Sequence, residues 1–305
     1  MTRYFSGMSI LFSTAFSPMY LLYAFLWAWG IESLVFLTLG ESQWSFGSES
    51  IVRGFSVYLS LFFLTLIDEI KDYQYDKEYN PDRVLVTGAL KHKDLILTAT
   101  GIVFVLLTLN FFMFPNAAFI IVADIIYACL LLLAESKSQR FKESVIINLI
   151  FTYPVQFLLS IYLVLSVVEQ QELLSSSFTP QVWLWPIAMM CAYLHYEMGR
   201  KTTWDTSNAK FYSSVLGSKT SGITVLTFGL LGIAISSYML IFVIQAWSSI
   251  ISSTLVIAQI TLVIIGFIRF ISQSKSWPQA FALGFFFLFL FSSPIHVLST
   301  AGAVW

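Results

Sequence analysis

Four carboxylates lie close together at the end of an apolar stretch in the first third of the chain. The stretch YLSLFFLTLI is followed directly by DEIKDYQYD, residues 68–76, which contains Asp68, Glu69, Asp72 and Asp76. If the helix continues, Asp68, Asp72 and Asp76 are spaced by four residues and share one face, where like charges repel. Oxygen-rich clusters of this kind suit hard divalent cations, and Mg²⁺ typically uses one or two carboxylates together with substrate phosphates. The spacing therefore indicates a magnesium site.

The same stretch has a simpler interpretation as a solvated helix end. Lys71, Lys77 and Arg83 follow closely enough in the sequence to pair with the acids. On this stretch alone, the solvated helix end and the metal site explain the pattern equally well.

A second charged stretch, YLHYEMGRKTTWD, repeats the spacing. It places Glu197, Lys201 and Asp205 at intervals of four residues, with Arg200 beside them. Arg and Lys can grip a diphosphate, Arg through bidentate contacts and Lys as a point charge. Taken singly, Arg200 and Lys201 are each better explained as basic residues that anchor the chain on the cytoplasmic side of a membrane. Two matched clusters on one membrane face instead indicate a shared polar cavity, because ionisable residues near membrane depth are functional candidates.

The composition requires that most of the chain avoids water. The sequence has 305 residues, of which 57% are hydrophobic and 11% are charged, whereas soluble domains carry about 25% charged residues. Several apolar runs approach or exceed the ~20 residues that cross a bilayer. The net charge of −1 gives no indication of a nucleic-acid partner. We therefore predict an all-α, polytopic membrane protein in contact with lipid.

Nine membrane-spanning helices are expected in a bundle around a central cavity. The first is long enough to be tilted or broken near Pro18, and the third and fourth are joined tightly through Pro115 and Asn116. The expected spans are residues 9–39, 51–67, 94–114, 116–134, 144–168, 181–197, 222–246, 250–270 and 279–300. We treat residues 1–305 as a single transmembrane domain.

The basic residues predict the orientation of these spans. With nine helices, fifteen of the sixteen Lys and Arg residues fall on the side of the N-terminus, and Arg53 alone falls on the other. Because basic residues favour the cytoplasmic side, we expect the N-terminus and the two long charged loops to be cytoplasmic. The C-terminus is then expected on the opposite side.

The first acidic stretch resembles a signature of the UbiA superfamily of intramembrane prenyltransferases. That signature is N-D-x-x-D-x-x-x-D, followed by a segment like N-R-P-x-R-P-x-x-x-G. Asp68 stands where the family has Asn, Glu69 stands where it has the first Asp, and Asp72 and Asp76 match. The match continues through the residues Asn80, Pro81, Asp82, Arg83 and Gly88.

Two later stretches extend the resemblance over nearly the whole chain. QRFKESVIIN is similar to the family's L-K-R segment with a later Asn, which points to Lys142 and Asn148. EMGRKTTWD, followed by YSSVLG, looks like a divergent version of the second signature, D-x-x-x-D or D-x-x-G-D.

The resemblance implies an enzyme that binds a prenyl diphosphate, of the farnesyl or geranylgeranyl class, through Mg²⁺. Ionisation would release pyrophosphate and leave an allylic cation, which alkylates an acceptor such as an aromatic compound, a quinone precursor or a lipid alcohol. The implied metal ligands are Asp68, Glu69, Asp72, Asp76, Glu197 and Asp205. The implied diphosphate-binding residues are Arg83, Lys142, Asn148, Arg200 and Lys201. Of these two sets, Asp72, Asp76 and Lys142 are assigned to catalysis.

Two departures from the family pattern leave a second enzyme class open. Lys201 replaces the second acid of the second signature, so that cluster has fewer anionic ligands than the family norm. We expect Glu197 with Asp205 to hold the second metal while Arg200 and Lys201 bind phosphate directly; the alternative is that only the first metal cluster remains. Asp68 in place of Asn gives D-E-x-x-D, which also resembles the D-D-x-x-D metal motif of terpene cyclases. A UbiA-type cyclase, which folds one prenyl diphosphate onto itself without an acceptor, is therefore the alternative.

A transporter or a non-catalytic scaffold fits less well. Transport pathways usually place charges in mid-helix, and Asp124 is the clear case here. We expect it to be a hydrogen-bonded structural acid. A scaffold would not need matched charged clusters at helix ends.

Overall fold

The computed structural model of the chain describes residues 2–40, 44–138, 141, 144–172, 180–207, 210–244 and 250–300. These residues form helices and no strand, which confirms the predicted all-α class. The chain divides into two compact units, one made of Met1–Ala28 and Phe46–Lys137 and the other of Trp29–Ser45 and Ser138–Trp305. The prediction that residues 1–305 act as a single domain stays a prediction.

Among the described residues, eight helices are long and apolar enough to cross a membrane. They correspond to eight of the nine predicted spans. The remaining one, α9 (Leu184–Arg200), has 17 residues and is preceded directly by the short helix η2 (Pro180–Trp183). The polytopic character is therefore confirmed.

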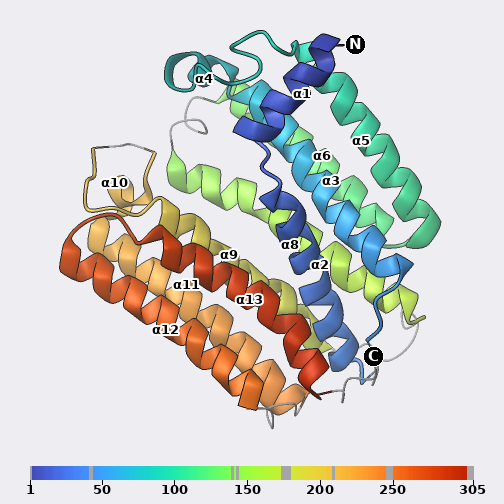
Figure 1. Cartoon of the computed structure of the whole chain (residues 1–305), viewed down its shortest axis with the longest axis vertical. Coiled ribbons are helices and arrows are strands. Elements are labelled where there is room, and N and C mark those ends of the chain that lie inside the picture. The colour runs from blue at the N-terminus through green and yellow to red at the C-terminus, as the bar shows by residue number, and fades with distance from the viewer. Residues whose placement is uncertain are drawn as a thin grey trace. The chain divides into compact units, whose positions relative to one another are not determined.

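The first unit is a group of antiparallel helices. α3 packs against α5 and α6, and α5 packs against α6 (Figure 1, blue to green). The helices are α1 (Thr2–Thr14), the beginning of α2 (Met19–Thr38), α3 (Ser48–Lys71), α4 (Tyr73–Tyr79), α5 (His92–Met113) and α6 (Ala118–Lys137). α5 and α6 are joined by residues 114–117, which confirms the tight connection predicted at Pro115 and Asn116.

The predicted break near Pro18 is present. α1 ends at Thr14 and α2 begins at Met19. Proline has no backbone N–H to donate and clashes with the preceding turn, so a helix cannot run through it without a kink. Ser17 begins the new helix, because its Oγ accepts a hydrogen bond of 3.3 Å from the N–H of Met19.

α1 is fixed to the beginning of α5 and to the segment that precedes it. Arg3 Nη2 lies 2.9 Å from Asp94 Oδ2, and the hydroxyls of Tyr4 and Thr98 are 2.7 Å apart. Gly7 permits a close approach, because a Cβ at this position would lie 2.6 Å from Leu90 Cδ2. The first helix therefore braces the end of the segment formed by residues 80–90.

Asn110 and Asp124 are among the buried polar residues in the helices of this unit. The amide of Asn110 in α5 donates to Ser56 Oγ in α3 at 2.8 Å, which ties the two helices together. Asp124 in α6 is 4% exposed, which agrees with the expected inward-facing acid. Its Oδ1, however, has no hydrogen-bond partner in the described part of the chain, so the expected hydrogen bonding is not seen at this atom.

The second unit is built around α9. This helix packs against α8, α11 and α13, and α12 packs against α11 and α13 (Figure 1, green to red). Its long helices are the end of α2, α8 (Val145–Gln170), α9, α11 (Ser218–Tyr238), α12 (Ile250–Gln273) and α13 (Gln279–Thr300). The short helix α10 (Tyr212–Leu216) precedes α11, and a π-helical turn, η3 (Met239–Val243), continues it.

Small residues bring α9 and α11 close together. A Cβ on Gly232 would lie 3.3 Å from the backbone of Ala188 and Ala192, and His195 Nδ1 lies 2.8 Å from the carbonyl oxygen of Val225. Because a carbonyl only accepts, this nitrogen carries the proton and donates. Close backbone approach through small residues is typical of helix pairs in membranes.

We expect Gly229→Ala to loosen this helix pair. The new methyl group would lie 2.6 Å from His195 Nδ1 and 2.9 Å from Val263 Cγ2. Overpacking of this kind costs about 1–3 kcal/mol of stability, which thermal unfolding in detergent would report as a lower midpoint. In the matched control, Gly101→Ala on α5, the methyl group would meet no described atom within 4 Å. An unchanged midpoint for Gly229→Ala would contradict this packing.

Candidate active site

The acidic stretch at the end of α3 is not one continuous helix. α3 ends at Lys71 and α4 begins at Tyr73, and Asp72 between them has φ −87° and ψ 5°. The helix is therefore interrupted at Asp72, so the condition of one continuous helix through the three acids is not met. The N–H of Asp72 still donates to the carbonyl oxygen of Asp68, and the N–H of Asp76 to that of Asp72, at 2.8 Å each. An interruption here eases the repulsion that three like charges on one helical face would cause.

Two of the four acids are buried and each has a partner. Glu69 is 4% exposed, and its Oε1 accepts a hydrogen bond of 2.6 Å from Arg83 Nη1. Asp76 is also 4% exposed and accepts a bond of 2.7 Å from the amide of Asn80. Asp76 and Asp68 add negative charge around Glu69. Arg83 therefore offsets the repulsion that gathers at the end of α3.

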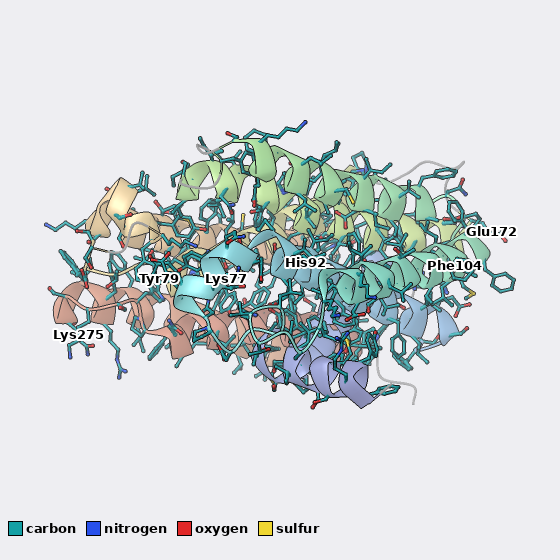
Figure 2. The ribbon with its side chains drawn as sticks, turned by 90° about the horizontal axis from the view of Figure 1, so that it is seen from above. Lys77, Tyr79, His92, Phe104, Glu172 and Lys275 are labelled. Carbon is teal, nitrogen blue, oxygen red and sulfur yellow. The ribbon has the colours of Figure 1, made fainter. Side chains whose placement is uncertain are left out.

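Lys71 pairs with a third acid of the stretch. Its Nζ lies 2.9 Å from Asp68 Oδ1 and 3.2 Å from Glu135 Oε2 on α6. Glu135 is 4% exposed, so Lys71 links the exposed Asp68 to a buried acid from another helix. Lys77 behaves differently, because it projects from α4 as an exposed side chain (Figure 2) and its Nζ lies 4.4 Å from the centre of the Tyr73 ring.

The first cluster has the donor chemistry of a magnesium site. The second carboxylate oxygen of Glu69, Oε2, is buried and has no hydrogen-bond partner among the described residues. A buried carboxylate oxygen without a partner is costly unless a proton donor or a cation joins it. No group of three metal-binding side chains converges in the described ranges; Arg83, Asn80 and Lys71 bond to the acids instead. A cation bound here would exchange with one of these partners.

The second charged stretch also leaves its helix early. α9 ends at Arg200, and Lys201 is its C-terminal cap. Asp205 lies in the following loop, where it is exposed. The predicted helical spacing of Glu197, Lys201 and Asp205 is therefore wrong for Asp205. Positive side chains are favoured at a helix C-terminus by the helix dipole, which suits Arg200 and Lys201 to this place.

Glu197 is surrounded by its own counter-ions. It is 7% exposed, and its Oε2 lies 2.5 Å from Arg200 Nε while its Oε1 lies 2.8 Å from Lys201 Nζ. The hydroxyl of Tyr212 is a further partner of this carboxylate. Burial, followed by the negative charge of Glu197, raises the pKa of Tyr212 well above its usual range. The phenol therefore stays protonated and donates to Glu197.

The loop after α9 is held in place by its neighbours in the second unit. The N–H of Thr203 donates to Ser213 Oγ at 3.1 Å, and Ser276 Oγ donates to Thr203 Oγ1 at 3.1 Å. Ser207 donates its N–H to Asp205 Oδ1 at 3.0 Å, which lowers the pKa of Asp205. Asp205 therefore stays ionised, and its carboxylate bonds to a residue of its own loop.

Aromatic side chains adjoin the charged end of α9. Tyr196 stacks on Phe286 with ring centres 5.4 Å apart, and Tyr193 meets the same ring edge-on at 6.0 Å. The sequence alone could not single out these three rings among 29 Phe, 14 Tyr and 9 Trp residues. Their place near the end of α9 follows from the packing of α9 against α13.

Asn148 and Lys142 are the remaining residues that were predicted to bind the diphosphate. Asn148 lies in the first turn of α8, and its neighbour Leu149 packs against the core cluster that contains Met198 and Tyr212. This places the start of α8 beside the end of α9. Lys142 lies outside the described residues.

Two residues with contacts in the clusters were missed from the sequence. Glu135 reaches Lys71 from α6, more than sixty residues further along the chain, and no motif marks it. Tyr212 is the first residue of YSSVLG, the stretch that continues the divergent second signature. The sequence therefore carried a signal for Tyr212 but none for Glu135.

Bilayer-length apolar helices with charged clusters at the ends of α3 and α9 define the class as a polytopic membrane protein. Comparison with solved structures gives the fold more closely. The chain is similar to the structure of a digeranylgeranylglyceryl phosphate synthase, with a TM-score of 0.54 and 15% identity over 93% of this chain and 99% of that one. It is equally similar to a UbiA homolog from Aeropyrum pernix K1, with a TM-score of 0.54 and 15% identity over 88% and 94% of the two chains. The chain therefore has the fold of UbiA-type membrane proteins.

No protein-family model and no curated protein sequence matches the chain significantly.

Proposed function

We propose that this protein is an intramembrane prenyltransferase that ionises a prenyl diphosphate with the help of Mg²⁺ and transfers the prenyl group to a hydrophobic acceptor. The fold supports the class, because one solved structure with this fold is a digeranylgeranylglyceryl phosphate synthase. The observation that carries the proposal is the buried pair Glu69 and Asp76, with Arg83, at the end of the bilayer-length helix α3. Such groups are costly at membrane depth and are retained where they have a function.

The acids of the first cluster would hold the cation. Asp68, Glu69, Asp72 and Asp76 supply carboxylate oxygens, which are the ligands that Mg²⁺ prefers. When bound, Mg²⁺ would neutralise charge on the diphosphate and make it a better leaving group. Arg83 would bind the diphosphate as a planar guanidinium. Lys142 would add a second positive charge.

The proposed reaction breaks one bond to C1 of the prenyl chain and forms another. The bond between C1 of the prenyl chain and the diphosphate oxygen breaks, and its electron pair leaves with the diphosphate. A nucleophilic carbon or oxygen of the acceptor then forms a bond to C1 and loses a proton. The acceptor class would be an aromatic compound, a quinone precursor or a lipid alcohol, and the prenyl donor would be of the farnesyl or geranylgeranyl class. The positive-inside bias supports a cytoplasmic location for the charged loops.

Removal of the metal should stop the reaction. We expect the purified protein to release pyrophosphate from a labelled farnesyl or geranylgeranyl diphosphate with Mg²⁺ and candidate acceptors present. EDTA should reduce this release to background, and excess Mg²⁺ should restore it, because the diphosphate leaves poorly without charge neutralisation. If no chain length gives pyrophosphate with any acceptor, the enzyme proposal is refuted.

A terpene cyclase is the second candidate function. The D-E-x-x-D pattern at residues 68–72 and the aromatic group of Tyr193, Tyr196 and Phe286 both favour it. Aromatic faces can stabilise a carbocation. In a cyclase, an internal double bond of the prenyl chain would attack C1, and loss of a proton or addition of water would end the reaction. A cyclic product formed without an acceptor would identify this activity, whereas release that depends on an acceptor would identify the transferase.

A further inference from the structure

We propose that the end of α9 is a metal-free binding site for a phosphate or diphosphate group. In this site Arg200 and Lys201 bind the anion, and Glu197, which accepts a hydrogen bond from Tyr212, is a positioning residue and not a metal ligand. The identification of the anion as the diphosphate of a prenyl substrate rests on the proposed function. Binding of a bare phosphate compound does not.

The charges of the cluster disfavour a divalent cation. Arg200 and Lys201 carry two positive charges against the single negative charge of Glu197. The group therefore has an excess of one positive charge within a few ångströms. At such distances two like charges repel strongly when they are partly shielded from water. A magnesium ion would meet this repulsion, whereas a phosphate would be attracted.

The carboxylate oxygens that could bind a metal ion in this cluster already have hydrogen-bond partners. One carboxylate oxygen of Glu197 bonds to Arg200 and the other to Lys201, at 2.5 and 2.8 Å. The other acid of this stretch, Asp205, bonds to Ser207 in its own loop. Neither cluster brings three acidic, His or Cys side chains together in the described part of the chain, so the difference lies in the charges and in the occupied oxygens of Glu197. The second cluster therefore does not fit Mg²⁺, whereas in the first Glu69 Oε2 has no hydrogen-bond partner among the described residues.

The cations of the cluster are suited to receive an anion. The side chain of Arg200 is 45% exposed and that of Lys201 is 33% exposed, although Glu197 between them is buried. A guanidinium has five N–H donors and an ammonium has three, which is more than the contacts with Glu197 use. Both side chains can therefore keep their hold on Glu197 while they bind a ligand from the accessible side.

Glu197 and the surrounding loop fix the geometry of these donors. Glu197 lies three and four residues before the two cations, so it draws both to one face of α9 and relieves their mutual repulsion. The backbone of the two elements is also joined, because the N–H of Tyr212 donates to the carbonyl oxygen of Lys201 at 3.0 Å. The binding groups are therefore held in place before any ligand arrives.

Direct binding measurements on the full-length protein in detergent test this inference. Calorimetric titration with inorganic pyrophosphate in EDTA should show binding to the unmodified protein. We expect Arg200→Gln and Lys201→Gln each to weaken it by about tenfold, the loss typical of one charge-assisted contact. The matched control is Lys219→Gln, which removes the same charge from an exposed lysine in the first turn of α11 and should change affinity less than about twofold. Pyrophosphate binding that requires a divalent cation would overturn the proposal.

Manganese titration separates the two clusters. With Mn²⁺ followed by electron paramagnetic resonance, Glu197→Gln should leave the number of bound ions and their affinity unchanged, whereas Asp76→Asn should weaken binding by tenfold or more. Loss of a bound ion in Glu197→Gln would refute the metal-free site. Because Glu197→Gln leaves two cations without their counter-ion, Tyr212→Phe provides a second variant that keeps every charge. It removes a hydrogen bond to Glu197, so it should weaken pyrophosphate binding by about threefold and leave Mn²⁺ binding unchanged; unchanged pyrophosphate affinity would mean that Tyr212 does not help to position the cations.

The outcome is separable from that of the proposed function. If no prenyl diphosphate is turned over but pyrophosphate binds without metal and depends on Arg200 and Lys201, the site stands and the enzyme proposal falls. If turnover is found but Glu197→Gln loses one bound Mn²⁺, the enzyme proposal stands and this inference falls.

Discussion

Asp76→Asn is expected to lower the rate of pyrophosphate release by about 10²–10³-fold, the scale of losing one strong electrostatic contact at a reacting centre. Asp76 is 4% exposed and bonds to the amide of Asn80. Asparagine has nearly the same shape, so the fold should be retained, but it replaces the carboxylate that we propose as a metal ligand with a neutral amide. Steady-state kinetics with Mg²⁺ titrated from low to saturating concentration would show whether the loss is partly recovered by more metal.

The control for this change is Asp82→Asn. Asp82 is an exposed acid six residues further along the chain, and its substitution removes the same charge. We expect its effect on turnover to be less than about twofold, because exposed charges interact weakly in water. Equal activity of Asp76→Asn and the unmodified protein would remove the first cluster from the proposed mechanism.

Arg83→Gln is expected to reduce both stability and turnover. Removing one member of a buried ion pair costs about 3–5 kcal/mol, because the other charge stays buried alone. Arg83 itself is 28% exposed, so water can reach Glu69 in part and we expect roughly 1–3 kcal/mol. Loss of a diphosphate-binding cation should lower turnover by about 10²-fold. Thermal unfolding and pyrophosphate release measure the two effects separately.

The double variant Glu69→Gln with Arg83→Gln distinguishes structure from catalysis. Two neutral amides can hydrogen-bond to one another, so most of the lost stability should return. Turnover should not return, because both a metal ligand and a diphosphate-binding group are absent. Recovery of turnover in the double variant would mean that the pair is structural only.

The sequence predicted the helices well because the bilayer imposes a simple length rule. Apolar runs of about 20 residues have one common solution in a membrane, which is a helix. The break at Pro18 and the turn at Pro115 followed from the chemistry of proline. α9 was harder, because its 17 residues lie close to the lower limit of a span.

The site was predicted only in part, for reasons that concern side-chain partners. The pairing of Arg83 with an acid of the first stretch agrees with the interpretation of a solvated helix end, but spacing alone did not show that the chain turns back to bring Arg83 to Glu69. The break at Asp72 depends on how charge repulsion competes with helix propagation, which spacing alone does not reveal. Glu135 reaches Lys71 only because α6 packs against α3, and such a contact is a property of the folded unit.

The brace formed by α1 also has a consequence for the order in which the protein is made. Arg3 pairs with Asp94, which is 91 residues further along the chain. At a synthesis rate of about 5–20 residues per second, its partner emerges roughly 5–18 seconds later. The first helix must therefore leave the ribosome and wait while α2 and α3 are inserted. The segment that carries Arg83 is secured at its far end only when α5 begins to appear, so this part of the candidate site is completed late in the assembly of the first unit.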